Sequence, residues 1–228
     1  MNSPEQIHPA LWRASQLGHA HGRTLDSGFR MLNRELPGQG WPLGQLMELL
    51  IDEPGTLECR LLLPALRQLT QGALMLVAPP YVPQVHGFSH DDSFRQRLVW
   101  VNPALLKDRL WATEQILRHR SSAAVLLWAD QLRNDQLRRL HLLAQQTESL
   151  LCLIRPMSVA QTPSPAALRI AALPASYGMQ VRILKRRGQA MDQHLPLYLP
   201  AHPYLSDLQH DRQPAVVQPA ERVSRLLQ

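Results

Sequence analysis

The sequence predicts an α/β fold with a mostly parallel central sheet. Several short segments, such as residues 73–78 and 123–129, are hydrophobic without interruption, as strands buried on both faces must be. Between them lie segments with apolar residues at helical spacing, as in residues 106–120. Because strands and helices alternate along the chain, we expect parallel strands joined by helices that cover both faces of the sheet.

The elements are expected in the following order. Residues 24–35 form a short amphipathic helix capped by Ser27 or Asp26. A glycine- and proline-rich turn leads into a strand at residues 45–51 and a helix at residues 58–71. Strands follow at residues 73–78, 97–101, 123–129 and 150–154, with helices at residues 106–120 and after a cap at Asn134. Residues 81–96 and 156–165 are expected to be loops, and residues 167–173 and 179–184 a hairpin.

Length and composition favour one domain with extensions. A chain of 228 residues, 45% hydrophobic, is long enough for one sizeable core. We expect a leader at residues 1–23, the α/β domain at residues 24–188, and a largely disordered tail at residues 189–228 that is rich in Pro, Gln and His. The first ten residues are polar and no apolar run reaches about 18 residues, so we expect a cytoplasmic protein without membrane contact.

The net charge of +6 comes almost entirely from arginine, since Lys107 and Lys185 are the only lysines. Such a charge favours nucleic acid or an acidic protein as partner, unless the arginines are simply spread over solvated helix faces. The densest cluster is Lys185-Arg186-Arg187. No aromatic-rich strand accompanies it as a base-stacking platform, so DNA contact is expected to be indirect or weak.

No residue pattern indicates a metal, a cofactor or a catalytic group. Cys59 and Cys152 lie in apolar segments and are expected to be reduced core thiols. His19 and His21 lack a third ligand at usable spacing. The loop cluster of His86, His90, Asp91 and Asp92 is better explained as polar loop residues.

The strand–turn–helix of residues 45–71 has the layout of a phosphate-binding P-loop, but its residues do not fit a phosphate. In the window that would read G-x-x-x-x-G-K-[ST], Ile51 and Thr56 replace the glycines, Leu57 the lysine, and Glu58 the magnesium-binding hydroxyl. Asp52, Glu53 and Glu58 also bring negative charge to the helix N-terminus. The sequence therefore predicts an ATPase-like scaffold that no longer binds nucleotide.

A second position supports the same prediction. In an ATPase the strand that contains Val125, Leu126 and Leu127 should end on a magnesium-binding carboxylate, but the next residue is Trp128. Asp130 lies two residues later, where a turn residue is expected. No nucleophile elbow or supported carboxylate pair is present in the sequence, so we expect a binding protein rather than an enzyme.

Several motifs resemble a known family. Residues 24–50, with LPGQGWPLG at residues 36–44 and MEL at 47–49, resemble the entry to the RecA-type ATPase core. Closer resemblance is to the ImuA family, RecA-like accessory proteins of bacterial damage-inducible translesion synthesis. The motifs that carry the resemblance to ImuA are LWR (11–13), the GWPLG turn (40–44), LLLPAL (61–66), APP (78–80), LVWV (98–101), RP (155–156) and LKRRG (184–188).

The resemblance implies a RecA-like three-layer sandwich with a degenerate P-loop, acting in the SOS DNA-damage response. The resemblance implies ImuB and a DnaE-type error-prone polymerase as partners, with RecA as a further possible partner. ImuB is a catalytically inactive relative of Y-family polymerases. Residues 46–172 also resemble SulA, the damage-induced inhibitor of cell division that binds FtsZ. The segment before residue 40 and the sequence KRRG at residues 185–188 favour ImuA over SulA.

Candidate partner-binding residues lie near the end of the chain. The cationic candidates are Lys185, Arg186 and Arg187. The apolar candidates, expected to order against a partner, are Leu205, Leu208, Val216, Val217, Val223, Leu226 and Leu227. The alternative is that this tail only keeps the protein soluble.

Overall fold

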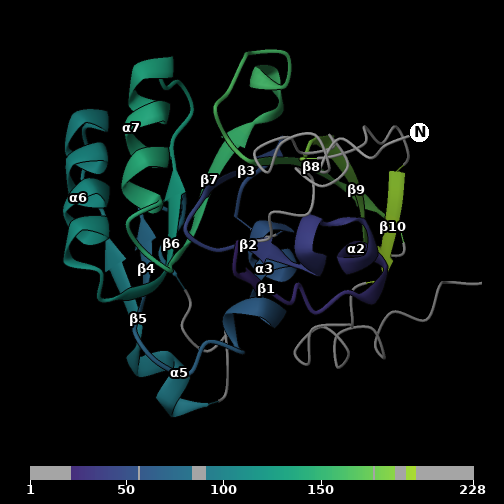
Figure 1. Ribbon diagram of the computed structural model, residues 1–228, viewed down its shortest axis with the longest axis horizontal. Coiled ribbons are helices and arrows are strands. Elements are labelled where there is room, and N and C mark those ends of the chain that lie inside the picture. The colour runs from purple at the N-terminus through teal and green to yellow at the C-terminus, as the bar shows by residue number, and fades with distance from the viewer. Residues whose placement is uncertain (1–21, 56, 84–90, 177, 188–193, 199–228) are drawn as a thin grey trace, which may run out of the picture. The chain divides into compact units, whose positions relative to one another are not determined.

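A computed structural model describes residues 22–55, 57–83, 91–176, 178–187 and 194–198. Its centre is an eight-stranded sheet in the order β10-β9-β8-β3-β7-β6-β4-β5 (Figure 1). Neighbouring strands from β8 to β5 are all parallel, whereas β8, β9 and β10 pair antiparallel. The strands are β3 Leu46–Ile51, β4 Ala73–Val77, β5 Leu98–Val101, β6 Ser122–Trp128, β7 Leu150–Pro156, β8 Leu168–Ala175, β9 Gly178–Lys185 and β10 His194–Tyr198.

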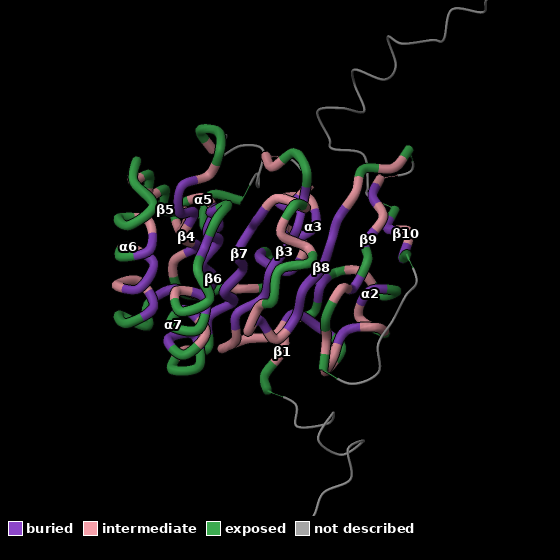
Figure 2. Tube along the Cα trace, turned by 90° about the horizontal axis from the view of Figure 1, so that it is seen from above, coloured by how far each residue is buried: buried purple, intermediate pink, exposed green. Residues whose placement is uncertain are grey.

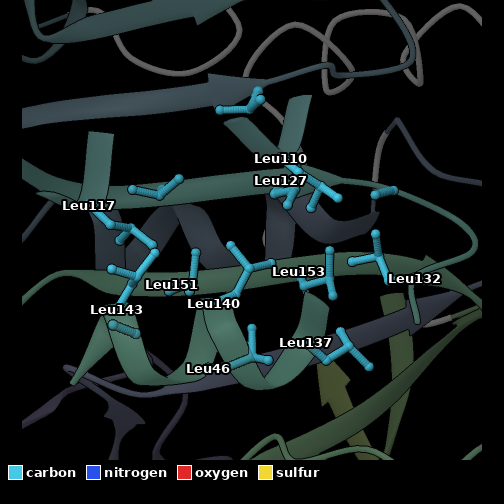
Figure 3. Close-up of a cluster of buried hydrophobic side chains, with 14 of the residues drawn as sticks. Leu46, Leu110, Leu117, Leu127, Leu132, Leu137, Leu140, Leu143, Leu151 and Leu153 are labelled. Atoms are coloured by element: carbon cyan, nitrogen blue, oxygen red, sulfur yellow. The ribbon is translucent and has the colours of Figure 1, made fainter. Parts of the chain in front are cut away.

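Helices flank both faces of this sheet. Helices α6 (Leu106–His119) and α7 (Asn134–Ala144) cover one face through a leucine-rich core (Figure 3). Helix α3 (Leu57–Leu66) lies on the other face, with the short α2 (Arg30–Glu35) and the two-stranded sheet of β1 (Thr24–Leu25) and β2 (Trp41–Pro42). The predicted α/β fold with a mostly parallel central sheet is confirmed.

The central strand β3 has no exposed residue, since all six of its residues are buried. Leu46 faces α7 together with Leu151 of β7, its partner in the strand register. Successive side chains of a strand point to opposite faces, so Met47 packs toward the α3 side. Figure 2 shows buried residues concentrated in the central strands and exposed residues on the outer surfaces of the helices. Burial on both faces explains why the segment is apolar at every position except Glu48.

Helix α3 is shorter than the predicted helix at residues 58–71. The amide groups of Gln68 and Leu69 bond to carbonyls three residues back, at Ala65 and Leu66. Such bonds tighten the last turn into 3₁₀ geometry, which often ends a helix. The chain then turns at Gly72, whose φ of +78° lies in the left-handed region.

Two predicted helix caps are wrong. Helix α7 begins after Arg133, whose N–H donates to Oε1 of Gln136 at 2.9 Å, so Asn134 is the first helical residue rather than the cap. Helix α2 has Phe29 at the N-cap and no side-chain cap bond. Ser27 Oγ instead accepts the N–H of Phe29, and Asp26 the N–H of Gly28, so both side chains stabilise the preceding turn.

Two further elements lie in segments predicted to lack regular structure. Within residues 81–96, helix α5 (Asp92–Gln96) is capped by Asp91, which accepts the N–H of Ser93 at 2.9 Å. Strand β10 pairs with β9 and buries Leu195 and Leu197. The sheet therefore continues beyond Gly188, where the sequence analysis ended the domain. Most of the predicted leader and tail lies outside the described residues, and none of the described helices has the length and apolarity to cross a bilayer.

Candidate functional site

The loop that the sequence analysis predicts to be a degenerate P-loop lies where α/β proteins place their ligands, beyond the carboxyl ends of the parallel strands. It connects the end of β3 at Ile51 to the start of α3 at Leu57. Strand β6 ends nearby at Trp128, with only β7 between β6 and β3 in the sheet. The strand order thus brings together the two segments that sequence analysis singled out separately.

Glu58 and Trp128 are in direct contact. The Glu58 side chain is fully buried, and its Oε1 accepts a hydrogen bond of 3.0 Å from the indole Nε1 of Trp128. In P-loop ATPases the residues at these two positions are a hydroxyl and a carboxylate that hold the same Mg²⁺. Here an indole N–H and a carboxylate bond to each other, so the two side chains occupy the space between the loop and β6.

The backbone of the loop between β3 and α3 also bonds to Glu58. The N–H of Gly55 donates to Glu58 Oε1 at 2.6 Å, whereas loop amides of a P-loop bond to phosphate oxygens. The ring of Tyr81, from the segment after β4, lies against Gly55, and a Cβ there would come within 2.5 Å of the ring. Gly55 has a φ of +131°, so both its conformation and this close contact require glycine.

The surroundings are unfavourable for a phosphate. Asp52 and Glu53 are exposed at the loop, and Glu58 lies in the first turn of α3. Burial and, second, the Glu58 carboxylate raise the pKa of the neighbouring Cys59 to about 12. Burial, with Glu58 and Glu48, also raises the pKa of Cys152. Both cysteines are free thiols, and burial is the main reason that neither readily forms a thiolate.

A buried charge network, missed by the sequence analysis, lies beside this site. Glu48 of β3 is completely buried and bonds to two arginines from the flanking strands. Its Oε1 lies 3.3 Å from Nη1 of Arg155 on β7, and its Oε2 lies 2.7 Å from Nε of Arg169 on β8. Ser164 Oγ donates to the same carboxylate at 2.6 Å. Charges buried in this way require partners, and each of the three charged groups has one.

This network holds the loop between β7 and β8 on the sheet. Arg169 donates to the carbonyls of Val159, Ala160 and Thr162, while Arg155 donates to the carbonyl of Asp130. Burial lowers the pKa of Arg155, although Glu48 opposes that shift. A charged residue inside each of three otherwise apolar strand segments is the sequence signal that could have revealed the network.

The cationic candidates are not gathered into one free patch. Lys185 Nζ donates to the carbonyl of Ser164 at 2.7 Å. Arg186 bonds to the Glu35 carboxylate at 3.2 Å and to the Glu35 carbonyl. Arg187 is exposed and has no ion-pair partner among the residues that the structure describes. Two of the three therefore stabilise the fold, and Arg187 remains available for an external partner.

The other candidates can be placed only in part. The apolar candidates of the tail, from Leu205 to Leu227, lie outside the described residues, as do His19, His21, His86, His90 and Thr56. Asp91 caps α5 and Asp92 pairs with Arg95. Across the described ranges, no three His, Cys, Asp or Glu side chains lie close enough to form a metal site.

A cavity of about 430 Å³ opens between the end of α3 and helix α5. Its lining includes Arg67, Phe94 and Arg97, with the Arg97 guanidinium over the Phe94 ring at 5.6 Å. Since these residues precede β4 and β5, the cavity lies at the amino ends of the strands, away from the loop between β3 and α3. Arg97 already donates toward the carbonyls of Gln71 and Gly72, which explains its position without a ligand.

Comparison with models of protein families and with curated protein sequences finds no significant match to this chain.

Proposed function

We propose that this protein is a non-catalytic, RecA-like accessory protein of the bacterial SOS DNA-damage response. In this proposal it belongs with the ImuA family and supports error-prone translesion synthesis through contacts with ImuB, a DnaE-type polymerase and RecA. The observation that supports a non-catalytic scaffold best is the hydrogen bond between Glu58 and Trp128. The family assignment itself depends on the sequence motifs described above.

The side chains at the loop between β3 and α3 disfavour nucleotide binding. A nucleotide could enter only if the Glu58 carboxylate released the N–H of Gly55 and the indole of Trp128. Hydrogen bonds to charged groups contribute about 1.5–3 kcal/mol each. The entering triphosphate would then face the carboxylates of Asp52, Glu53 and Glu58 without the lysine that normally offsets its charge. These costs favour a scaffold that binds proteins instead of ATP.

The scaffold supports a role in protein contacts in two ways. The buried network of Glu48, Arg155 and Arg169 fixes the loop between β7 and β8 at the carboxyl edge of the sheet, where this fold class usually carries recognition. The exposed side chains of Tyr81 and Val82, 70% and 60% accessible, lie in the segment that follows β4. Large exposed apolar side chains of this kind are common in protein interfaces.

A pull-down tests the proposed partners. Full-length protein and a chain ending at Tyr198 should each be immobilised and offered ImuB, the DnaE-type polymerase and RecA. The full chain should retain at least one of them. Equal recovery by the shorter chain would locate the contact on the α/β domain and remove the apolar tail residues from the proposal. If neither chain retains any of the three proteins, the proposal is wrong.

A cellular assay separates the proposal from the SulA-like alternative. Deleting the gene should reduce damage-induced mutation without changing cell length. If the protein instead acts like SulA, its expression should make cells filament, and immobilised protein should retain FtsZ. The neighbouring genes offer a quick check, since an operon with ImuB and a second DnaE-type polymerase favours the ImuA role.

A further inference from the structure

Strand β5 forms one end of the sheet, and among the described strands it pairs only with β4 (Figure 2). The carbonyl of Val101 accepts the N–H of Ala78, so Val101 directs its backbone groups toward β4. Because this direction alternates along a strand, the N–H and C=O groups of Leu98 and Trp100 point away from β4. We call this outer side of β5, Leu98–Val101, the open edge.

The open edge lacks the features that usually prevent a further strand from pairing. Proteins protect sheet edges with proline, charged side chains or bulges. Strand β10, at the other end of the sheet, contains Pro196. Strand β5 reads LVWV and pairs with β4 without a shift in register. Its length of four residues limits the number of bonds that it can offer, but all of its side chains are apolar.

Exposed apolar side chains also gather at this end of the sheet. Of the ten large hydrophobic side chains that are exposed in the described residues, four lie within residues 99–106. They are Val99, Leu105, Leu106 and Trp100, the last of which is 46% accessible. Together they expose roughly 300 Å², the size of an apolar surface patch that is often functional.

We propose that the open edge pairs with the same edge of a second copy of this chain, antiparallel about a two-fold axis at Val99. In this register Leu98 of each copy lies opposite Trp100 of the other, and each of these two pairs exchanges both of its hydrogen bonds. The two Val99 residues form the intervening non-hydrogen-bonded pair, where side chains lie closest. Because both copies use the same edge, the pairing closes at a dimer.

The side chains on both faces of β5 fit this register. Val99 is the register partner of Met75, which packs against the core beneath α6 and α7. The two Val99 side chains would therefore meet on the side of the sheet that carries these helices. Successive side chains alternate between faces, so Trp100 lies on the other side, where it would cover Leu98 of the second copy.

The available area matches a weak dimer. Two patches of roughly 300 Å² make up the apolar share, about 60%, of an interface of roughly 1,000 Å² in total. A biological interface needs about 1,000 Å², and interfaces below about 1,200 Å² are generally weak and transient. A strand from an unrelated protein would need apolar side chains at matching positions, whereas a second copy supplies them by symmetry. This inference goes beyond the proposed function, which requires only contacts with other proteins.

Sedimentation velocity of the full-length protein between about 1 and 200 µM tests the proposal. The chain should shift from monomer to dimer over this range and form nothing larger. Trp100→Lys places a charge in the open edge and should raise the dissociation constant at least about 30-fold.

The matched control is Trp111→Lys, at an exposed tryptophan of α6. Trp111 lies one helical turn before Glu114, which pairs with Arg139 of α7. Residues three apart lie on the same side of a helix, so Trp111 lies toward α7 and away from β5. This control should change the dissociation constant less than about twofold.

Two further variants test the register. Val99→Cys places two thiols opposite each other across the two-fold axis, with Cβ atoms about 4.5–5.5 Å apart, so mild oxidation should give a disulfide-linked dimer. Trp111→Cys should not cross-link. Leu98→Pro removes an N–H that β4 does not use and should weaken the dimer about tenfold, since both copies lose a hydrogen bond. Thermal unfolding of each variant establishes that the fold is intact.

Three results would overturn the proposal. The first is a full-length protein that remains monomeric at the highest concentration or associates beyond a dimer. The second is an equal effect of Trp100→Lys and Trp111→Lys, which would mean that another surface, or charge alone, controls association. The third is a Val99→Cys chain that forms the dimer but does not cross-link, which would exclude this register.

Discussion

Replacing Trp128 with phenylalanine should lower the free energy of unfolding by about 2.5–4 kcal/mol. Most of this loss, about 1.5–3 kcal/mol, is the hydrogen bond that the indole donates to the buried carboxyl group of Glu58. The rest, roughly 1 kcal/mol, is the smaller volume of the new ring at a position that is only 6% exposed. Urea unfolding followed by circular dichroism measures the total, provided that the m-value is unchanged.

A double-mutant cycle isolates the hydrogen bond. In a Glu58→Met background no acceptor remains, so Trp128→Phe should cost only the volume term of about 1 kcal/mol. The coupling energy between the two positions should then be about 1.5–3 kcal/mol. A coupling below about 0.5 kcal/mol, within the error of additive sites, would refute the claim that these two side chains hold each other in place between the loop after β3 and strand β6.

Three further outcomes are expected. Glu48→Ala should destabilise the protein by about 3–5 kcal/mol in urea unfolding, because it leaves two buried guanidiniums uncompensated. The matched control is Glu148→Ala, which removes an exposed, paired carboxylate and should cost under about 1 kcal/mol. Because the pKa of Cys59 is raised to about 12, the rate at which its thiol is alkylated should still increase between pH 9 and 12. The stability that the buried thiol contributes at neutral pH should fall over the same range. An alkylation rate that is already at its maximum by pH 9 would contradict this. A chain ending at Gly188 should be less stable than one ending at Tyr198 by about 3–6 kcal/mol, because it lacks the two buried leucines of β10; equal melting of the two chains would mean that β10 adds nothing.

Hydrophobic periodicity explains why most of the helices and strands could be predicted. The helix expected at residues 106–120 is α6, Leu106–His119, because apolar residues at helical spacing leave little choice of face. Predominantly apolar segments likewise located β3, β4, β6 and β7. Strand β10 was missed because its five residues contain proline and lie in a segment whose composition indicates disorder.

The sequence indicated individual residues of the candidate site but not the contacts between them. The sequence identified Glu58 and Trp128 as misfits to an ATPase, but they are 70 positions apart, and their contact depends on β7 lying alone between β3 and β6. The network around Glu48 joins residues more than 100 positions apart. Local patterns carry no information about which distant strands become neighbours, so these contacts required the structure.

Isothermal titration calorimetry of the full-length protein with ATP and with ADP, each with Mg²⁺, tests the central claim most directly. A site closed by Glu58, Gly55 and Trp128 should give no binding heat at millimolar nucleotide. Saturable, magnesium-dependent binding at micromolar concentration would contradict a non-catalytic scaffold and make an energy-using enzyme the better account.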